Sequence, residues 1–80
     1  MSSHSDDAKL IYMANQIGAF FKAQDATTAS EKIAEHIKKF WDPRMRQAII
    51  AQIDTGGGAG LDPAAREAVE TLRLRRGFLP

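Results

Sequence analysis

Apolar residues recur along this chain at intervals of three or four positions, which is the spacing of amphipathic α-helices. The first such stripe consists of Leu10, Met13, Ala14, Ile17, Phe20 and Phe21. Asp6 and Asp7 precede it, and carboxylates at a helix N-terminus cap free N–H groups and interact favourably with the helix dipole. The pattern predicts a helix over about residues 7–23, which the polar run at 24–28 ends.

A second stripe begins after this polar run and ends at a pair of aromatic residues. Its apolar members are Ile33, Ile37 and either Phe40 or Trp41. Thr28 and Glu31 have the spacing of a capping box, although Ser30 is a competing cap. We expect this helix to end by Trp41 or Asp42, because the residue before a proline disfavours helical dihedral angles.

Two Asp-Pro dipeptides predict two further helix starts. Aspartate caps a helix, and proline suits its first position because the N–H there needs no partner. After Asp42–Pro43, a third stripe ends at Asp54 and consists of Met45, Ile49 and Ile53. After Asp62–Pro63, a shorter, alanine-rich stripe predicts a fourth helix that docks loosely. Its members are Ala65, Ala68, Val69 and Leu72.

The run at 55–60, Thr-Gly-Gly-Gly-Ala-Gly, predicts a flexible connector. A phosphate-binding loop would follow a strand and precede Lys and Ser/Thr, whereas Leu-Asp-Pro follows here. No segment shows the alternation of a β-strand. The sequence therefore predicts an all-α fold, a small bundle of three to four short helices joined by tight Asp-Pro turns and a Gly-rich loop. It divides into a flexible N-terminal tail at 1–6, a single helical domain at 7–72 and a basic C-terminal tail at 73–80.

Large aromatic side chains occur in two adjacent pairs, Phe20–Phe21 and Phe40–Trp41. Neighbouring residues on a helix point about 100° apart, so both members of a pair cannot face the centre of a thin core. We expect one member of each pair to lie at the flank, and Trp41 rather than Phe40 to lie near the rim. A chain of 80 residues builds little core. The excess of large aromatic side chains favours an apolar patch that a partner covers. The alternative is that four helices bury all of these side chains.

Composition excludes several classes of protein. The chain has no cysteine, which rules out disulfides and thiolate metal sites. A net charge of +1 argues against a strongly electrostatic nucleic-acid-binding module, although basic residues cluster around the second helix. No apolar run approaches the roughly 18 residues of a membrane span, and the N-terminus lacks the order of a secretory signal. We expect a cytoplasmic protein that binds neither nucleic acid nor membrane.

No set of residues has the spacing of a catalytic or metal site. Ser30, His36 and Asp42 could supply a nucleophile, a base and an acid, but no nucleophile elbow accompanies them. His36 follows Glu35 without the second histidine of a zinc-binding helix, which favours a partly buried or surface histidine. We therefore expect no catalytic, cofactor-binding or metal-binding residue in this chain.

Three segments, in one order, carry a family resemblance. They are Leu10–Phe21 (LIYMANQIGAFF), Ile33–Asp54 (IAEHIKKFWDPRMRQAIIAQID) and Gly56–Leu72 (GGGAGLDPAAREAVETL). The most specific pieces are MANQIG, FWDPRMR and the glycine run with the Pro-x-x-Arg-Glu-Ala that follows it. Over residues 10–72 the chain resembles the delta subunit of the NAD-dependent, molybdenum-containing formate dehydrogenases of bacteria.

The resemblance implies a place in a complex that oxidises formate to carbon dioxide and passes electrons to NAD. In such complexes the molybdenum (or tungsten) pterin and most iron–sulfur clusters lie in the large alpha subunit, and FMN and NAD bind in other subunits. The delta subunit has no cofactor of its own. The resemblance thus implies a non-catalytic accessory subunit that binds and stabilises the large alpha subunit within the hetero-oligomer. The alternatives are a transient maturation chaperone for cofactor insertion into that subunit and a small helical nucleic-acid-binding module.

The predicted contact with the large subunit combines aromatic, methionine and arginine side chains, which are favoured in protein–protein hot spots. One patch surrounds the first Asp-Pro turn and consists of Phe40, Trp41, Arg44, Met45 and Arg46. A second patch on the first helix consists of Met13, Asn15, Gln16 and Phe20. We expect apolar burial to drive association and the arginines to pair with carboxylates at the rim.

Overall fold

Four α-helices make up the part of the chain that the structure, a computed structural model, describes: residues 3–76, with side chains from 7 to 75. They are α1 (Ser3–Gln24), α2 (Ala29–Phe40), α3 (Pro43–Gly56) and α4 (Pro63–Arg76). No strand occurs between residues 3 and 76, and the predicted all-α bundle is confirmed. α1 and α4 extend into the two segments predicted as tails, of which residues 1–2 and 77–80 lie outside the described part.

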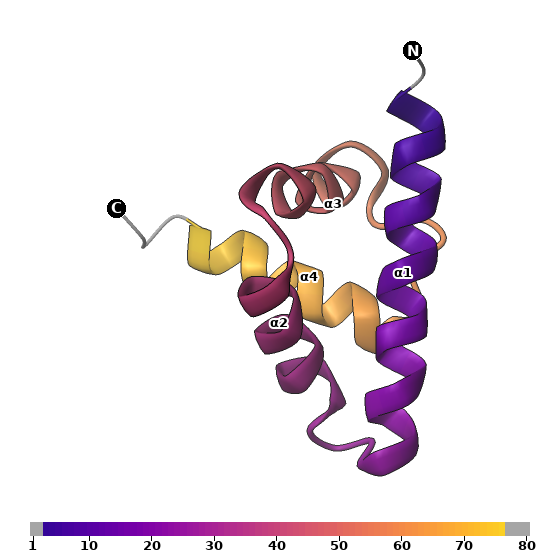
Figure 1. Ribbon diagram of the computed structural model, residues 1–80, viewed down its shortest axis with the longest axis vertical. Helices are drawn as coiled ribbons and strands as arrows, with labels where there is room; N and C mark the ends of the chain where they lie inside the picture. Colours follow the sequence, from indigo (N-terminus) through magenta and orange to yellow (C-terminus); the bar gives the residue numbers. More distant parts are fainter. Residues whose placement is uncertain (1–2, 77–80) are drawn as a thin grey trace.

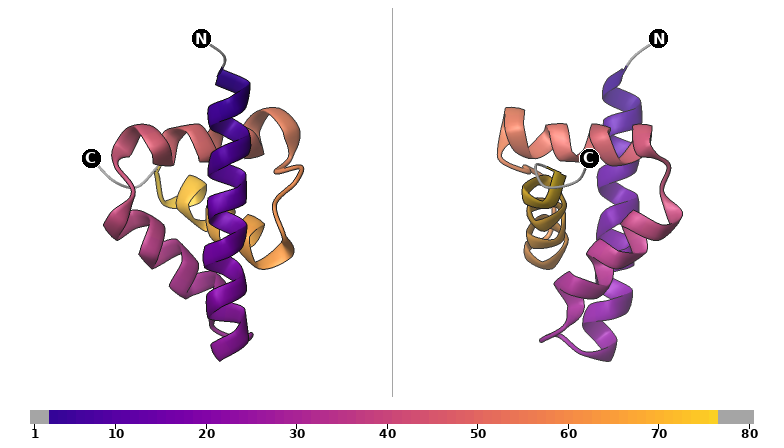
Figure 2. Two further views of the ribbon diagram at one scale, coloured as in Figure 1. Left: turned by 45° about the vertical axis from the view of Figure 1, so that its right-hand side comes forward. Right: turned by 90° about the vertical axis from the view of Figure 1, so that its left-hand side faces the viewer.

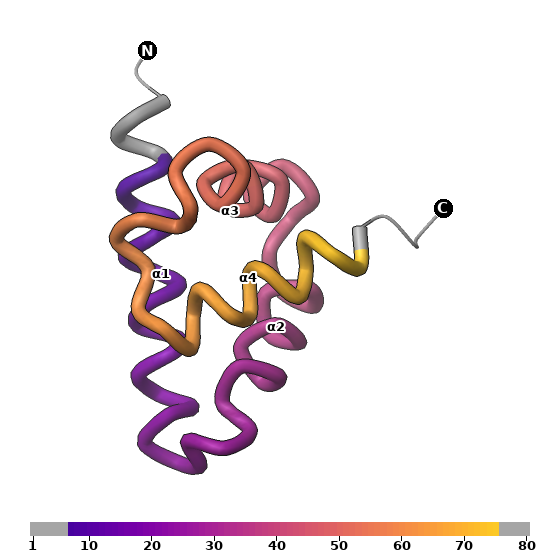
Figure 3. Tube along the Cα trace, turned by 180° about the vertical axis from the view of Figure 1, so that it is seen from behind, coloured from indigo at the N-terminus to yellow at the C-terminus, as the bar shows by residue number. Residues whose placement is uncertain are grey.

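α1 and α4 hold the bundle together, because each of them packs against the three other helices. α1 stands along one edge of the molecule, with α3 beside its N-terminal half and α2 beside its C-terminal half (Figure 1). Figure 2 shows that α3 crosses α1 rather than running alongside it. α4 covers the back of this layer, as the reverse view in Figure 3 shows.

The core joins the apolar stripes of all four helices. Its largest fully buried side chains are Ile33, Ile37, Ile49 and Val69. Small residues set the spacing between the helices: a Cβ on Gly18 would lie 3.4 Å from Ile33 Cδ1 and 3.7 Å from Ala65 Cβ. No polar or charged side chain among the described residues is buried, so this core holds the fold and offers no group for acid–base chemistry.

The first Asp-Pro turn forms as predicted. Asp42 Oδ1 accepts a hydrogen bond of 2.9 Å from the Met45 N–H, and Pro43 is the first residue of α3. One member of the aromatic pair faces outward, as expected, but the prediction that Trp41 lies at the rim is wrong. Trp41 is only 5% exposed, whereas Phe40 is 67% exposed. The reason is that α2 ends at Phe40, and Trp41 has extended dihedral angles that turn its ring into the core.

The prediction that the fourth helix docks loosely is also wrong. Ala65, Ala68 and Val69 are fully buried in α4, and Leu72 nearly so. Because alanine side chains are small, α4 can approach α1 and α2 closely enough to fill the space between them. Arg73 adds polar contacts, with its Nε 3.1 Å from Glu70 Oε1 and 3.6 Å from Asp54 Oδ1.

The Gly-rich run is a hydrogen-bonded turn. The N–H groups of Gly57 and Gly58 donate to the carbonyl oxygens of Ile53 and Gln52, which closes α3 in a Schellman arrangement. Gly57, Gly58 and Gly60 have positive φ angles of 66°, 80° and 92°. Glycine alone adopts such angles without strain, so the composition of the run follows from the path of the chain.

The turn between α1 and α2 differs from the predicted capping box. Thr28 occupies the N-cap position of α2, but its side chain makes no capping hydrogen bond. Instead, Asp25 Oδ1 accepts bonds of 2.6 and 3.0 Å from the hydroxyl and N–H groups of Thr27. These bonds lower the pKa of the Asp25 carboxyl. The stability that they contribute is therefore present above the unfolded pKa and is lost as the pH falls through the lowered value.

Candidate protein-interaction surface

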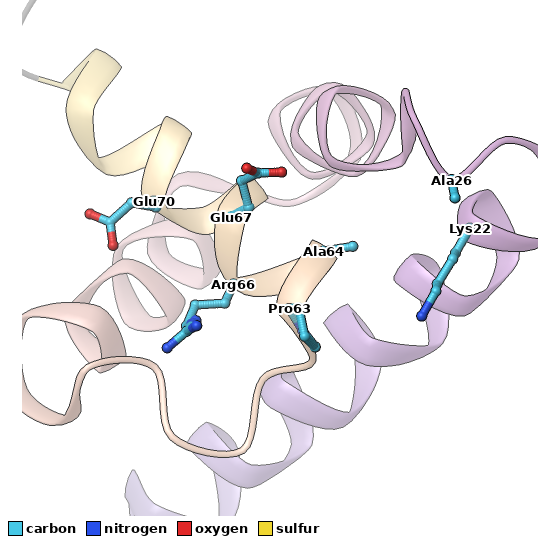
Figure 4. A pocket seen from close by; sticks show the side chains of 7 residues that line it. All are labelled: Lys22, Ala26, Pro63, Ala64, Arg66, Glu67 and Glu70. Carbon is cyan, nitrogen blue, oxygen red and sulfur yellow. The ribbon is translucent and has the colours of Figure 1, made fainter.

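The described surface has no converging set of catalytic groups. A hollow of about 560 Å³ lies between the end of α1 and the start of α4, and its charged side chains include Lys22, Arg66 and Glu67 (Figure 4). Arg66 and Glu67 point away from each other, and Lys22 stands apart on α1. No nucleophile, base and acid meet there.

Residues with potential metal or acid–base chemistry have other surroundings. Asp42 caps α3, and the His36 ring contacts two phenylalanine rings, edge to face with Phe21 and tilted against Phe40. No group of three His, Asp or Glu side chains within the described residues could hold a metal ion. The chain also has no cysteine that could ligate an iron–sulfur cluster. No described helix has the length and apolar character of a membrane span.

Four rings from α1 and α2 form a continuous patch that we call the aromatic cluster: Phe20, Phe21, His36 and Phe40. Phe20 and Phe21 meet edge to face with centroids 5.2 Å apart, Phe21 lies 6.0 Å from His36, and His36 lies 4.7 Å from Phe40. The two outer rings are the exposed ones, at 59% for Phe20 and 67% for Phe40. Lys39 Nζ lies 5.7 Å from the Phe40 centroid, so a cation borders the cluster.

A second feature joins the two patches predicted from the sequence. Met13 on α1 and Arg44 and Met45 on α3 line one hollow where these helices cross. Both methionines pack on the core with one part of their side chains and remain partly exposed with the other. The fold thus places residues that are far apart in sequence on one surface.

Three other predicted contact residues have contacts within the bundle. Trp41 belongs to the core, and Arg46 Nη1 donates to the carbonyl oxygens of Trp41 and Lys38 at 2.7 and 3.0 Å. These bonds satisfy carbonyl groups at the end of α2. The Asn15 side chain donates to the Gly60 carbonyl at 2.9 Å and accepts from the Asp62 N–H at 2.8 Å, tying the Gly-rich turn to α1. Their first role is therefore to hold the fold.

Asn15→Ala is expected to lower the free energy of unfolding by about 1–2 kcal/mol, because two backbone groups lose their partner. Gln16→Ala is the matched control: its exposed side chain bonds only to Tyr12 within α1, and the expected change is below about 0.5 kcal/mol. Urea unfolding followed by circular dichroism measures both variants. Equal effects would mean that the hydrogen bonds between Asn15 and the Gly-rich turn contribute nothing to stability.

Sequence reasoning missed two members of the aromatic cluster, Phe21 and His36. His36 and Phe40 are four residues apart on α2, a spacing that places side chains side by side and could have indicated the pair. The contact of Phe21 with His36 joins two helices, and no local spacing reveals it. Leu10 was assigned only to an apolar stripe and Ala48 only to a position beside one, yet both also line the hollow between α1 and α3.

Comparison with known proteins identifies a family for this chain. No curated protein and no solved structure gave a match. A family profile described as NADH-dependent formate dehydrogenase delta subunit, FdsD, matches residues 9–69. These residues include α2, α3, the Gly-rich turn, most of α1 and half of α4, which are the segments that carried the resemblance. The chain belongs to the delta subunit family of the NADH-dependent formate dehydrogenases.

Proposed function

We propose that this chain is a non-catalytic accessory subunit that binds the large molybdenum-pterin subunit of its formate dehydrogenase and stabilises it. The aromatic cluster carries the proposal. Four helices close a core without Phe20 and Phe40, so two large rings remain in water on adjacent helices. Exposed aromatic side chains are enriched at the centre of protein–protein contacts. If the delta subunit binds the folded, cofactor-loaded large subunit more tightly than other states, mass action stabilises that state.

The double variant Phe20→Ala/Phe40→Ala tests this proposal. The isolated chain should keep its helical circular dichroism, because both rings lie largely outside the core. Recovery of the large subunit by the tagged chain should fall, with an affinity at least about 30-fold lower, as for the loss of a hot spot of 2 kcal/mol or more. Leu74→Ala is the control, since Leu74 is an exposed apolar residue on α4 outside the cluster. Undiminished recovery by the double variant would rule out the cluster as the contact.

A stoichiometric subunit and a maturation chaperone differ in two measurements. The subunit co-purifies with the active complex in a fixed ratio, whereas a chaperone leaves before that stage. Without the delta chain, we expect the large subunit to contain a normal amount of molybdenum but to dissociate and unfold at lower temperature. A metal-free but equally stable large subunit would favour the maturation role instead.

A further inference from the structure

The hollow between α1 and α3 has a chemistry of its own, and we call it the methionine groove. It has a volume of about 380 Å³ and is lined by Lys9, Leu10, Met13, Arg44, Met45 and Ala48. This volume lies within the range of about 300–1,000 Å³ that is typical of ligand pockets. The four apolar residues belong to the core or pack against it, so the floor of the groove is part of the folded bundle.

The floor and the rim of the groove differ sharply in character. The thioether side chains of Met13 and Met45 are flexible and polarizable, and such surfaces adapt to varied apolar partners. Lys9 and Arg44 stand on opposite helices, α1 and α3, and both are exposed. Among the residues whose side chains the structure describes, 7–75, no carboxylate lines the groove. The groove therefore combines an adaptable apolar floor with positive charge on two sides.

Lys9 and Arg44 differ from Arg46 and Arg73 in having no contact with a described residue that uses their charge. Arg46 donates to backbone carbonyls, and Arg73 pairs with Glu70 and Asp54. Lys9 and Arg44 form no hydrogen bond or ion pair with any residue in the described part of the chain. Exposed, unpaired cations around an apolar floor are complementary to an apolar segment with carboxylates on its flanks.

We propose that the methionine groove receives a short apolar segment of the large subunit, flanked by Asp or Glu residues that pair with Lys9 and Arg44. This second docking site rests on the proposed function and adds to it the chemistry of the segment that is bound. The chain's own C-terminal segment is less suited, since 73–80 (RLRRGFLP) carries three arginines and no carboxylate side chain. A second copy of the chain has a net charge of +1 and lacks the acidic character that the rim favours.

Photo-crosslinking in the purified complex identifies the occupant. Of the chain's three methionines, Met13 and Met45 both line the groove, so photo-methionine labels it with little change in shape. We expect crosslinks to a large-subunit peptide that has apolar residues between acidic ones. The matched control is Met13→Leu/Met45→Leu, which keeps an apolar floor and should lose these crosslinks. Crosslinks to a second copy, to residues 73–80 of this chain, or to no partner would overturn the proposal.

Charge reversal at the rim supplies an independent measurement. Lys9→Glu/Arg44→Glu should lower the affinity for the large subunit about tenfold at low ionic strength and flatten its dependence on salt. Lys22→Glu/Arg75→Glu changes the net charge equally at two exposed positions outside the groove and should have little effect. Equal weakening by both variants would mean that only net charge matters, and it would overturn the proposed docking site.

The same assay separates the two proposals. If the wild-type chain does not bind the large subunit at all, the proposed function is wrong. If the wild-type chain binds and the rim variant binds equally well, only the proposal for the methionine groove is wrong.

Discussion

Replacing Trp41 by alanine is expected to lower the free energy of unfolding of this chain by about 3–5 kcal/mol, the cost of removing a large aromatic side chain from a core. Trp41 is 5% exposed and belongs to the same core cluster as Ile33, Ile37 and Ile49. A core in a chain of this size rarely supplies more than about 3–5 kcal/mol. We therefore expect the variant to be largely unfolded at room temperature.

Phe40→Ala is the matched control for this prediction. It removes the neighbouring aromatic ring, but this ring is 67% exposed, and the expected change is within about 0.5 kcal/mol. Circular dichroism during a urea titration measures both variants, because Trp41→Ala removes the only tryptophan and its fluorescence. In the wild-type chain, Trp41 emission should be blue-shifted and resistant to quenching. If the two variants lose equal stability, Trp41 does not lie in the core.

The pair Phe40–Trp41 also shows where periodicity stops being informative. The 100° rule relates neighbours only while both residues are helical, and α2 ends at Phe40. Trp41 has φ of −86° and ψ of 141°, so the extended backbone rather than the helix directs its ring. The nearby proline indicated that the helix would stop, but the inward turn of Trp41 depends on where α3 packs.

The fourth helix shows a second limit of sequence patterns. Its start at Asp62–Pro63 and its stripe at Ala65, Ala68 and Val69 were predictable, and all three stripe residues are buried. Alanine carries little hydrophobic signal, and for this reason the stripe by itself predicts loose docking. In the folded chain its small size is what matters, because Ala65 meets Gly18 of α1 at close range. The fit between two small residues on distant segments cannot be deduced from either segment alone.

The candidate surface was predictable in its composition more than in its geometry. Met13, Arg44 and Met45 were proposed as contact residues in two separate patches, and the fold brings them into one groove. Trp41 and Arg46 were proposed for the same reason, the enrichment of such residues in interfaces, yet both hold the turn between α2 and α3. Tryptophan and arginine also stabilise small folds, and only burial and hydrogen bonding separate the two roles.

Gly58→Ala is the other substitution with a large expected effect on stability. Gly58 is buried with φ of 80°, and a Cβ there would lie 2.7 Å from Ile53 Cδ1 and 3.0 Å from Arg66 Cγ. We expect a loss of about 2–4 kcal/mol, of which about 1–2 kcal/mol comes from the left-handed backbone and the rest from overpacking. Because the close atoms belong to side chains that can rotate, Ile53 and Arg66 should shift to make room, and the four helices should remain.

Substitutions at the two preceding glycines separate the contribution of the left-handed backbone from that of overpacking. Gly57 has φ of 66°, but no atom lies within 4 Å of the position that a Cβ would occupy, so Gly57→Ala should lose only the backbone contribution, about 1–2 kcal/mol. Gly56 lies in the last turn of α3 with open space around it, and Gly56→Ala should gain up to about 1 kcal/mol. Urea midpoints should thus fall in the order Gly56→Ala, wild type, Gly57→Ala, Gly58→Ala. Equal losses at 57 and 58 would show that the close packing of Ile53 and Arg66 on the turn adds nothing, and no loss at either would contradict the left-handed turn itself.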